Sequence, residues 1–159
     1  MSVRVGQHMA RLRILWAAML ASLPVYAAVA LFASSTAEAA ADRGDALVWV
    51  LGALAAVNLV TVAPVLEAQL ARARRAFAAG AGPESLLGGH QAAMLLAWAR
   101  VEAVGVLGLV AYFTSGNTTY LTAFLAVAAL GLLVLRPSEK PIRDLLATPS
   151  PAPPAPIEP

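Results

Sequence analysis

Residues 91–113 read QAAMLLAWARVEAVGVLGLVAYF, an apolar stretch interrupted near its middle by Arg100 and Glu102. About 20 mostly apolar residues suffice for a helix to cross a hydrocarbon core about 30 Å thick. Backbone groups find no water to bond inside lipid, so such a stretch must be helical. It therefore predicts a membrane-spanning helix that carries two charged side chains deep in the bilayer.

Three further apolar stretches cover approximately residues 12–34, 46–66 and 118–135. The chain is 60% hydrophobic and only 13% charged, whereas soluble domains are about half apolar and a quarter charged. The alternation of an outer-membrane strand is absent. We therefore predict an all-α, four-helix transmembrane bundle over residues 1–147, with the lipid bilayer as its partner. The proline-rich tail at 148–159 is expected to be disordered.

The basic residues predict the orientation of the bundle. Nine of the eleven fall before the first stretch, between the second and third, or after the fourth: Arg4, Arg11, Arg13, Arg72, Arg74, Arg75, Arg136, Lys140 and Arg143. The positive-inside rule places these segments, and hence both termini, in the cytoplasm. The order predicts two antiparallel hairpins, the last closed by a tight turn at 115–118. The location implied is a bacterial cytoplasmic membrane, crossed several times.

Two segments that border the apolar stretches each allow two interpretations. The first stretch and the following SSTAEAA resemble a cleaved signal peptide. However, its apolar run of about 20 residues exceeds the usual 7–15, which favours a retained helix over the cleavage alternative.

Within the polar region at 67–90, LEAQLARARRAFAA extends a helical pattern to Gly80. Its arginines are expected to lie at the lipid headgroups, with an anionic-lipid or partner site as the alternative.

The composition also excludes several classes of function. The chain has no cysteine, so it forms no disulfide framework and has no thiolate metal site. His8 and His90 are far apart in sequence, which argues against a metal site. His90 is expected to be a cap or surface residue. No glycine-rich phosphate loop is present, so no cofactor is expected, and the basic residues border apolar stretches instead of forming a nucleic-acid surface.

Glu102 is the most informative residue for function. It lies about 16 Å from the cytoplasmic edge of its stretch, where a charge costs about 2.5–3.5 kcal/mol on insertion scales. Arg100 can snorkel toward the headgroups, but the shorter Glu102 cannot. Two residues apart, they point about 200° away from each other and need separate partners. We expect a polar layer of Glu102, Arg100 and Asn58, with Thr61 one turn away.

Other residues of the third stretch favour helix packing. Gly105, Gly108, Ala99 and Ala103 are small enough to let neighbouring helices approach closely. Tyr26 of the first stretch is deep enough to join a polar network, although a hydroxyl there more often bonds a backbone carbonyl.

The segment from Trp98 to Tyr112 resembles the ion-carrying helix of rotary ATPase proteolipid subunits. That helix reads approximately Ala-x-x-Glu-Ala-x-x-x-x-Gly-Leu-Val, and Glu102-Ala103 and Gly108-Leu-Val match its spacing. The chain also resembles small four-span bacterial membrane proteins with a glutamate in the third helix and an Arg-Pro pair after the fourth. The first resemblance implies that Glu102 is an ion-binding carboxylate. However, that carboxylate usually closes a hairpin, whereas this one opens it, and Arg100 would favour the ionised form.

Two functions follow as hypotheses. The first is a non-enzymatic accessory or structural subunit that associates, as a homo-oligomer or within a larger membrane complex, through its polar third helix. The second is an ion- or proton-translocating subunit with Glu102 as the carrier. An enzyme is not expected, because no histidine, serine–lysine or paired-carboxylate set accompanies Glu102.

Overall fold

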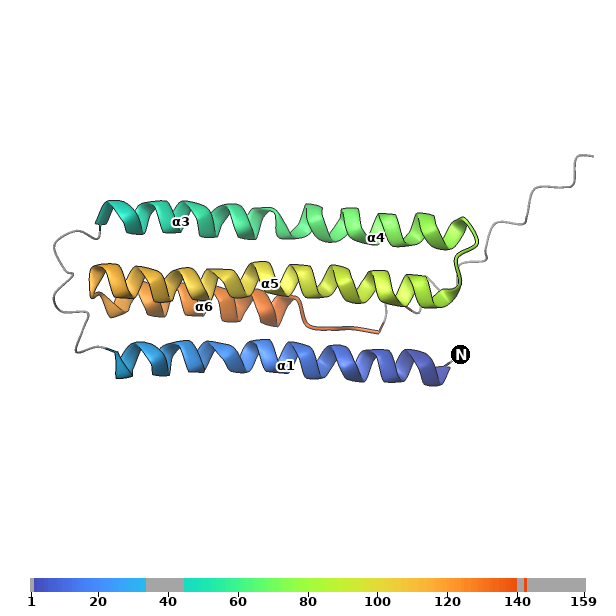
Figure 1. The fold of residues 1–159 in the computed structure, drawn as a ribbon, viewed down its shortest axis with the longest axis horizontal. Helices are drawn as coiled ribbons and strands as arrows, with labels where there is room; N and C mark the ends of the chain where they lie inside the picture. Colours follow the sequence, from blue (N-terminus) through green and yellow to red (C-terminus); the bar gives the residue numbers. More distant parts are fainter. Residues whose placement is uncertain (1, 34–44, 140–141, 143–159) are drawn as a thin grey trace, which may run out of the picture.

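The computed structural model describes residues 2–33, 45–139 and 142, and this part of the chain is built from α-helices (Figure 1). The predicted all-α class is therefore confirmed. The segment SSTAEAA, where cleavage was considered, and the predicted disordered tail at 148–159 lie outside the described residues. The helices are α1 (Ser2–Phe32), α3 (Asp45–Val60), α4 (Val62–Ala78), α5 (Pro83–Ser115) and α6 (Thr118–Val134).

Three helical segments are long and apolar enough to cross a membrane: Val5–Phe32, Ala46–Ala78 and Pro83–Ser115. The second combines α3 and α4. The shorter apolar helix α6 has 17 residues, which at 1.5 Å per residue extend about 26 Å. By length and composition, this is a membrane protein with three candidate spanning helices.

The helices extend well beyond the predicted apolar stretches. At 1.5 Å per residue, α1 and α5 are about 46 and 50 Å long, against a hydrocarbon core of about 30 Å. The polar region at 67–90 is mostly helical: α4 runs to Ala78, and α5 begins at Pro83. Gly82 is an extended N-cap and Pro83 is the first helical residue, a position that suits proline because its missing N–H needs no partner. Between the helices, Gly80 adopts φ 92°, which glycine adopts without strain.

Helix α5 is the centre of the bundle. It packs against each of the other helices. Figure 1 shows it between α1 and the α3–α4 pair, with α6 alongside. The core includes side chains of α5 that are at most 1% exposed, such as Trp98, Val101 and Val104. The stretch at 91–113 therefore organises the fold, because every other helix is positioned by contact with it.

The helical rod formed by α3 and α4 is interrupted at Thr61. The interruption comes three residues before Pro64, whose ring clashes with the carbonyl four residues earlier and which cannot donate a backbone hydrogen bond. The Thr61 hydroxyl donates to the carbonyl of Val57 at 2.7 Å and lies 3.1 Å from that of Asn58. The break thus sets a polar side chain in the middle of an apolar rod.

A short turn joins α5 to α6, in agreement with the turn predicted at 115–118. Gly116 caps α5 with φ 68°, and the Asn117 side chain accepts a hydrogen bond from the N–H of Thr119. After α6 the chain remains packed on the bundle: Trp98 Nε1 donates to the carbonyl of Leu135 at 3.0 Å, and Ile142 is 1% exposed.

Candidate functional site

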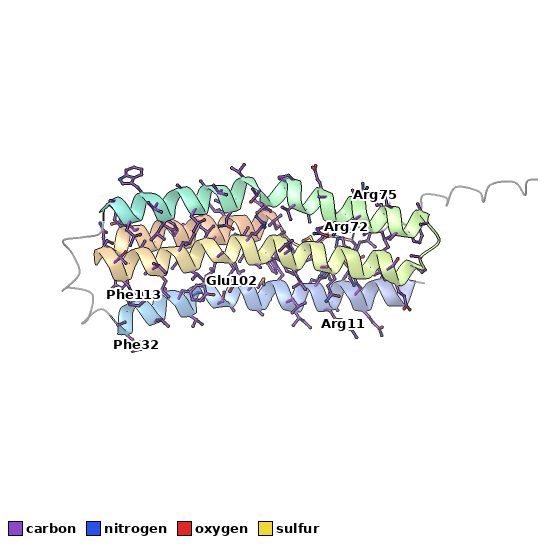
Figure 2. All side chains as sticks on the ribbon, turned by 45° about the horizontal axis from the view of Figure 1, so that its top comes forward. Arg11, Phe32, Arg72, Arg75, Glu102 and Phe113 are labelled. Carbon is purple, nitrogen blue, oxygen red and sulfur yellow. The ribbon has the colours of Figure 1, made fainter. Side chains whose placement is uncertain are left out.

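The carboxylate of Glu102 is bound by two hydroxyl groups of α1. Ser22 Oγ donates to Glu102 Oε1 at 2.7 Å, and Tyr26 OH donates to the same oxygen at 2.8 Å. Ser22 and Tyr26 are four residues apart, so they lie on one face of α1. Hydrogen bonds to an ionised acceptor are stronger than neutral ones. Together they hold the Glu102 side chain against α1 near the middle of the bundle (Figure 2).

The two hydroxyl donors are not equivalent. Ser22 Oγ also lies 2.6 Å from the backbone carbonyl of Met19. A serine hydroxyl has one hydrogen, so it serves either the carbonyl of its own helix or Glu102 at any moment. Tyr26 donates to Glu102 and lies on an adjacent turn. Tyr26 is therefore the steadier of the two donors.

Arg100 is bound on a different side of α5. Its Nη1 donates to Thr61 Oγ1 at 2.6 Å, at the break between α3 and α4. Its Nε is buried and has no hydrogen-bond partner within the described residues. Arg100 therefore links α5 to the α3–α4 rod, while Glu102 links α5 to α1.

The expected polar layer is thus divided into two separate contacts. Arg100 binds Thr61, which was expected one turn away from it, and not Asn58, which was expected at its level. Asn58 instead donates to the carbonyl of Leu54 in its own helix at 3.0 Å and joins neither charged residue in the described part of the chain. The separation follows from the 200° between side chains two positions apart on a helix, which lets a single flanking helix meet only one of them.

Sequence reasoning did not identify Ser22, and it considered Tyr26 only as a less common participant. A signal was nevertheless present. Ser22 lies ten residues into the stretch 12–34, and Glu102 eleven residues into the stretch 91–113. If both stretches begin on the cytoplasmic side, the rise of 1.5 Å per residue places these side chains at nearly the same depth.

The four small residues expected to serve helix packing fall into two groups. A Cβ at Gly108 would lie 2.5 Å from Phe124 Cβ of α6, and one at Gly105 would lie 3.0 Å from Leu23 Cδ2 of α1. Both glycines therefore allow close contact inside the chain. Ala99 is exposed and Ala103 is half-buried, so neither is fully used by the contacts of a single chain.

The two histidines are placed differently from the expectation. His90 is 6% exposed and His8 is 9% exposed, and their ring centroids are 5.7 Å apart. The interpretation of His90 as a cap or surface residue is wrong, because α5 begins at Pro83 and carries His90 into its contact with α1. His8 Nε2 and His90 Nδ1 have no hydrogen-bond partner within residues 2–33, 45–139 and 142. A polar hollow of about 230 Å³ borders His8 and includes Arg11 and Glu84 in its lining.

A further glycine, next to His90, brings the start of α5 close to α4. A Cβ at Gly89 would lie 2.4 Å from the Cβ of Ala73 in α4. This close approach draws the first turns of α5 against α4, so α5 is packed on two sides well before the apolar stretch begins. Of the two glycines before His90, Gly89 therefore serves helix packing, whereas a Cβ at Gly88 would meet nothing within 4 Å.

The arrangement around Glu102 provides hydrogen-bond acceptor and donor groups. Within the described residues, no group of three or more histidine, aspartate and glutamate side chains could hold a metal ion. The groups hydrogen-bonded to Glu102 are hydroxyls from α1. The site can hold a carboxylate or bind a small cation through oxygen atoms. Comparison with protein-family models, curated proteins and solved structures gave no match for the chain.

A first prediction concerns the Tyr26 hydroxyl. Tyr26→Phe is expected to lower the free energy of unfolding by about 1 kcal/mol, because Glu102 loses its steadier donor. Tyr120→Phe is the control, since Tyr120 is half-buried and donates no hydrogen bond among those of the described residues. The measurement is detergent-induced unfolding in mixed micelles, followed by far-UV circular dichroism. Equal losses in the two variants would argue that the Tyr26 hydroxyl is not specifically engaged.

Proposed function

We propose that the chain is a multi-pass protein of the bacterial cytoplasmic membrane, with four crossings, two antiparallel hairpins and both termini in the cytoplasm. Arg11, Arg72 and Arg75 lie toward the end of the bundle where the N-terminus lies, away from Phe32 and Phe113 (Figure 2). This distribution supports the charge-based orientation. Retention of α1 is supported by its part in the core, where Met9 and Leu12 are at most 1% exposed.

The proposed role is that of a non-enzymatic accessory or structural subunit that associates through α5. The observation that carries this proposal is that both deep charges of α5 are already engaged with neighbouring helices: Glu102 with α1 and Arg100 with Thr61. These contacts make α5 a rigid central element with a defined orientation. A rigid helix face loses little conformational freedom when it meets a partner, which favours association.

A second candidate is an ion- or proton-translocating subunit with Glu102 as the carrier. The specific observation in its favour is the cluster of oxygen atoms formed by Glu102, Ser22 and Tyr26. Oxygen ligands suit hard cations. The glutamate is only half-buried, so the site is not sealed inside the bundle. The proteolipid-like spacing around Glu102 points in the same direction.

Carbodiimide labelling of the protein in lipid separates the two roles. These reagents attack protonated carboxyl groups in apolar surroundings. The structural role predicts negligible labelling of Glu102 at about pH 7, because its carboxylate oxygen is held by Ser22 and Tyr26 of α1. Glu102→Gln is the control for labelling at other carboxyl groups. Labelling that persists above about pH 7 and is blocked by a cation would instead establish the carrier.

The same substitution tests function directly. Glutamine keeps an oxygen that can accept from both Ser22 and Tyr26. Under the structural role, Glu102→Gln therefore leaves the size of the lipid-embedded particle unchanged. Under the carrier role, the particle also persists, but proton or cation flux into proteoliposomes is lost. Flux in the wild-type protein and none in the variant would overturn the accessory role.

A further inference from the structure

The segment after α6 limits how far a bilayer can extend along the bundle. Helix α6 ends at Val134, and residues 136–139 form no helix, although the side chains of Arg136 and Ser138 are exposed. Irregular backbone that faces lipid leaves N–H and C=O groups without partners, so it does not occur within the hydrocarbon region. The hydrocarbon therefore has to end close to Leu135.

The length and position of α6 agree with this limit. Its 17 residues extend about 26 Å, close to the thickness of a hydrocarbon core, and its other end is the polar turn at Gly116 and Asn117. Figure 1 shows α6 beside only the half of the bundle that lies away from the N-terminus, and it shows the break between α3 and α4 near the same point along the bundle. In contrast, α5 begins at Pro83 and runs for about 22 Å before it reaches Trp98.

Two indole groups lie at the end of α6. Trp98 Nε1 of α5 donates to the carbonyl of Leu135 at 3.0 Å, and Trp16 Nε1 of α1 donates to the carbonyl of Leu132 at 2.7 Å. Tryptophan is enriched where membrane proteins cross the interface between lipid and water. We call this position along the bundle, marked by Trp16 and Trp98, the Trp98 level.

Exposed apolar side chains are distributed unequally about the Trp98 level. On the side that contains α3 and α6, the helices expose many large apolar side chains, such as Phe32 and Val134, which are 90% and 84% exposed. The helical segments on the other side comprise residues 2–15, 62–78 and 83–97. Within the described part of these segments, the exposed large apolar side chains are Ile14 and Leu96 alone, and each lies two residues from a tryptophan of the Trp98 level. Such a surface suits water, not lipid.

We propose that the bilayer covers the bundle only from the α5–α6 turn to the Trp98 level, and that residues 2–15, 62–78 and 83–97 stand in water as a three-helix cytoplasmic extension. The extension has a core of its own, which includes the buried side chains of Met9 and Leu12. The inference rests on the proposed orientation for the name of the side, whereas the position of the boundary is independent of it.

The boundary changes the expected depth of Glu102. This residue lies four positions after Trp98, and therefore about 6 Å inside the hydrocarbon edge, not about 16 Å as its place in the apolar stretch predicts. Arg100 lies closer still to the edge, so its charge is near the headgroups. Cytoplasmic water then comes within about one helical turn of the Glu102 carboxylate.

The arginines of α4 also acquire different surroundings. Arg72 and Arg75 lie about 16 and 21 Å along the helix from the break at Thr61. The headgroup layer on one side of a bilayer is only about 5–7 Å thick. These arginines therefore lie beyond the headgroups and face the water of the cytoplasm.

Cysteines along the uncovered face of α5 test the boundary, because the natural chain contains no cysteine. The variants are Leu96→Cys, Val106→Cys and Val110→Cys, at positions that are 38%, 41% and 40% exposed, so shielding by the protein is matched. In sealed membrane vesicles, Leu96→Cys is expected to react with a membrane-impermeant maleimide at least about tenfold faster than the other two, because hydrocarbon excludes the polar reagent. If the bilayer extended to Gln91, Leu96 would lie about 7 Å inside it. Equal rates for Leu96→Cys and Val106→Cys would then be observed, and they would overturn the inference.

Vesicles of the two orientations separate the boundary from the side of the membrane. Leu96→Cys is expected to react in inside-out vesicles and to be protected in right-side-out vesicles. The opposite result would overturn the cytoplasmic placement and the proposed orientation, whereas the contrast with Val106→Cys would still support the boundary. After denaturation in detergent, the three variants should react at equal rates, which controls for the intrinsic reactivity of each cysteine.

Discussion

Replacing Trp98 with alanine is expected to lower the free energy of unfolding by about 3 kcal/mol, the low end of the range for buried aromatic residues. Trp98 is 0% exposed, and its Nε1 donates to the carbonyl of Leu135 at 3.0 Å. Alanine leaves a cavity in the buried cluster that includes Leu132 and removes the donor that binds the chain after α6. The loss should appear as unfolding at lower detergent fraction in mixed micelles, followed by far-UV circular dichroism.

Trp49→Ala provides the matched control. Trp49 is 81% exposed on α3, so its removal leaves no internal cavity and is expected to change stability by less than about 0.5 kcal/mol. Trp98→Phe separates the two causes, because it refills most of the space without restoring the N–H donor. A similar loss for Trp98→Ala and Trp49→Ala would contradict the placement of Trp98 in the core.

Much of the fold follows from the stretch at 91–113. Its length and apolarity predict a spanning helix, and that helix is the one against which all the others pack. The helix bounds were less predictable. Hydropathy reports which residues prefer lipid, whereas α1, α4 and α5 continue beyond the apolar stretches. There α5 packs against α1 through His90 and His8, and against α4 through Gly89 and Ala73.

The candidate site was predictable in its charged residues but not in its partners. Glu102 and Arg100 are conspicuous because charges in a bilayer are costly. Which flanking helix each one meets depends on how the bundle is arranged, and helix spacing alone does not determine that. Asn58 was expected beside Arg100 because of its depth, yet Thr61 takes that place, since the break before Pro64 brings its hydroxyl to the guanidinium.

The glycine positions are a second case in which the sequence alone does not determine the contact. The four small residues that were predicted to serve packing in the third stretch could not be told apart from the sequence. The structure uses Gly105 and Gly108 within the chain and leaves Ala99 on the exposed face. An apolar pattern indicates that a helix face avoids water. Only the arrangement of the other helices shows whether that face contacts the same chain.

Gly108→Ala is expected to destabilise the fold by about 2 kcal/mol, a cost typical of overpacking. The new Cβ would lie 2.5 Å from Phe124 Cβ and 3.2 Å from Phe124 Cγ. Because the Cβ of Phe124 is attached directly to the backbone of α6, rotation of the ring cannot relieve the contact. The two helices must separate, and the packing around their shared face is weakened over several turns.

Gly52→Ala is the matched control, because the same substitution is not expected to destabilise the fold there. Gly52 lies within α3, and a Cβ there would meet nothing within 4 Å. Alanine is a better helix former than glycine by about 1 kcal/mol, so Gly52→Ala should be neutral or stabilising. The same chemical change thus has opposite expected effects at two helical positions, and only the distance to the neighbouring helix separates them. If both variants shifted stability in the same direction, the contact between α5 and α6 could not be as close as the structure shows.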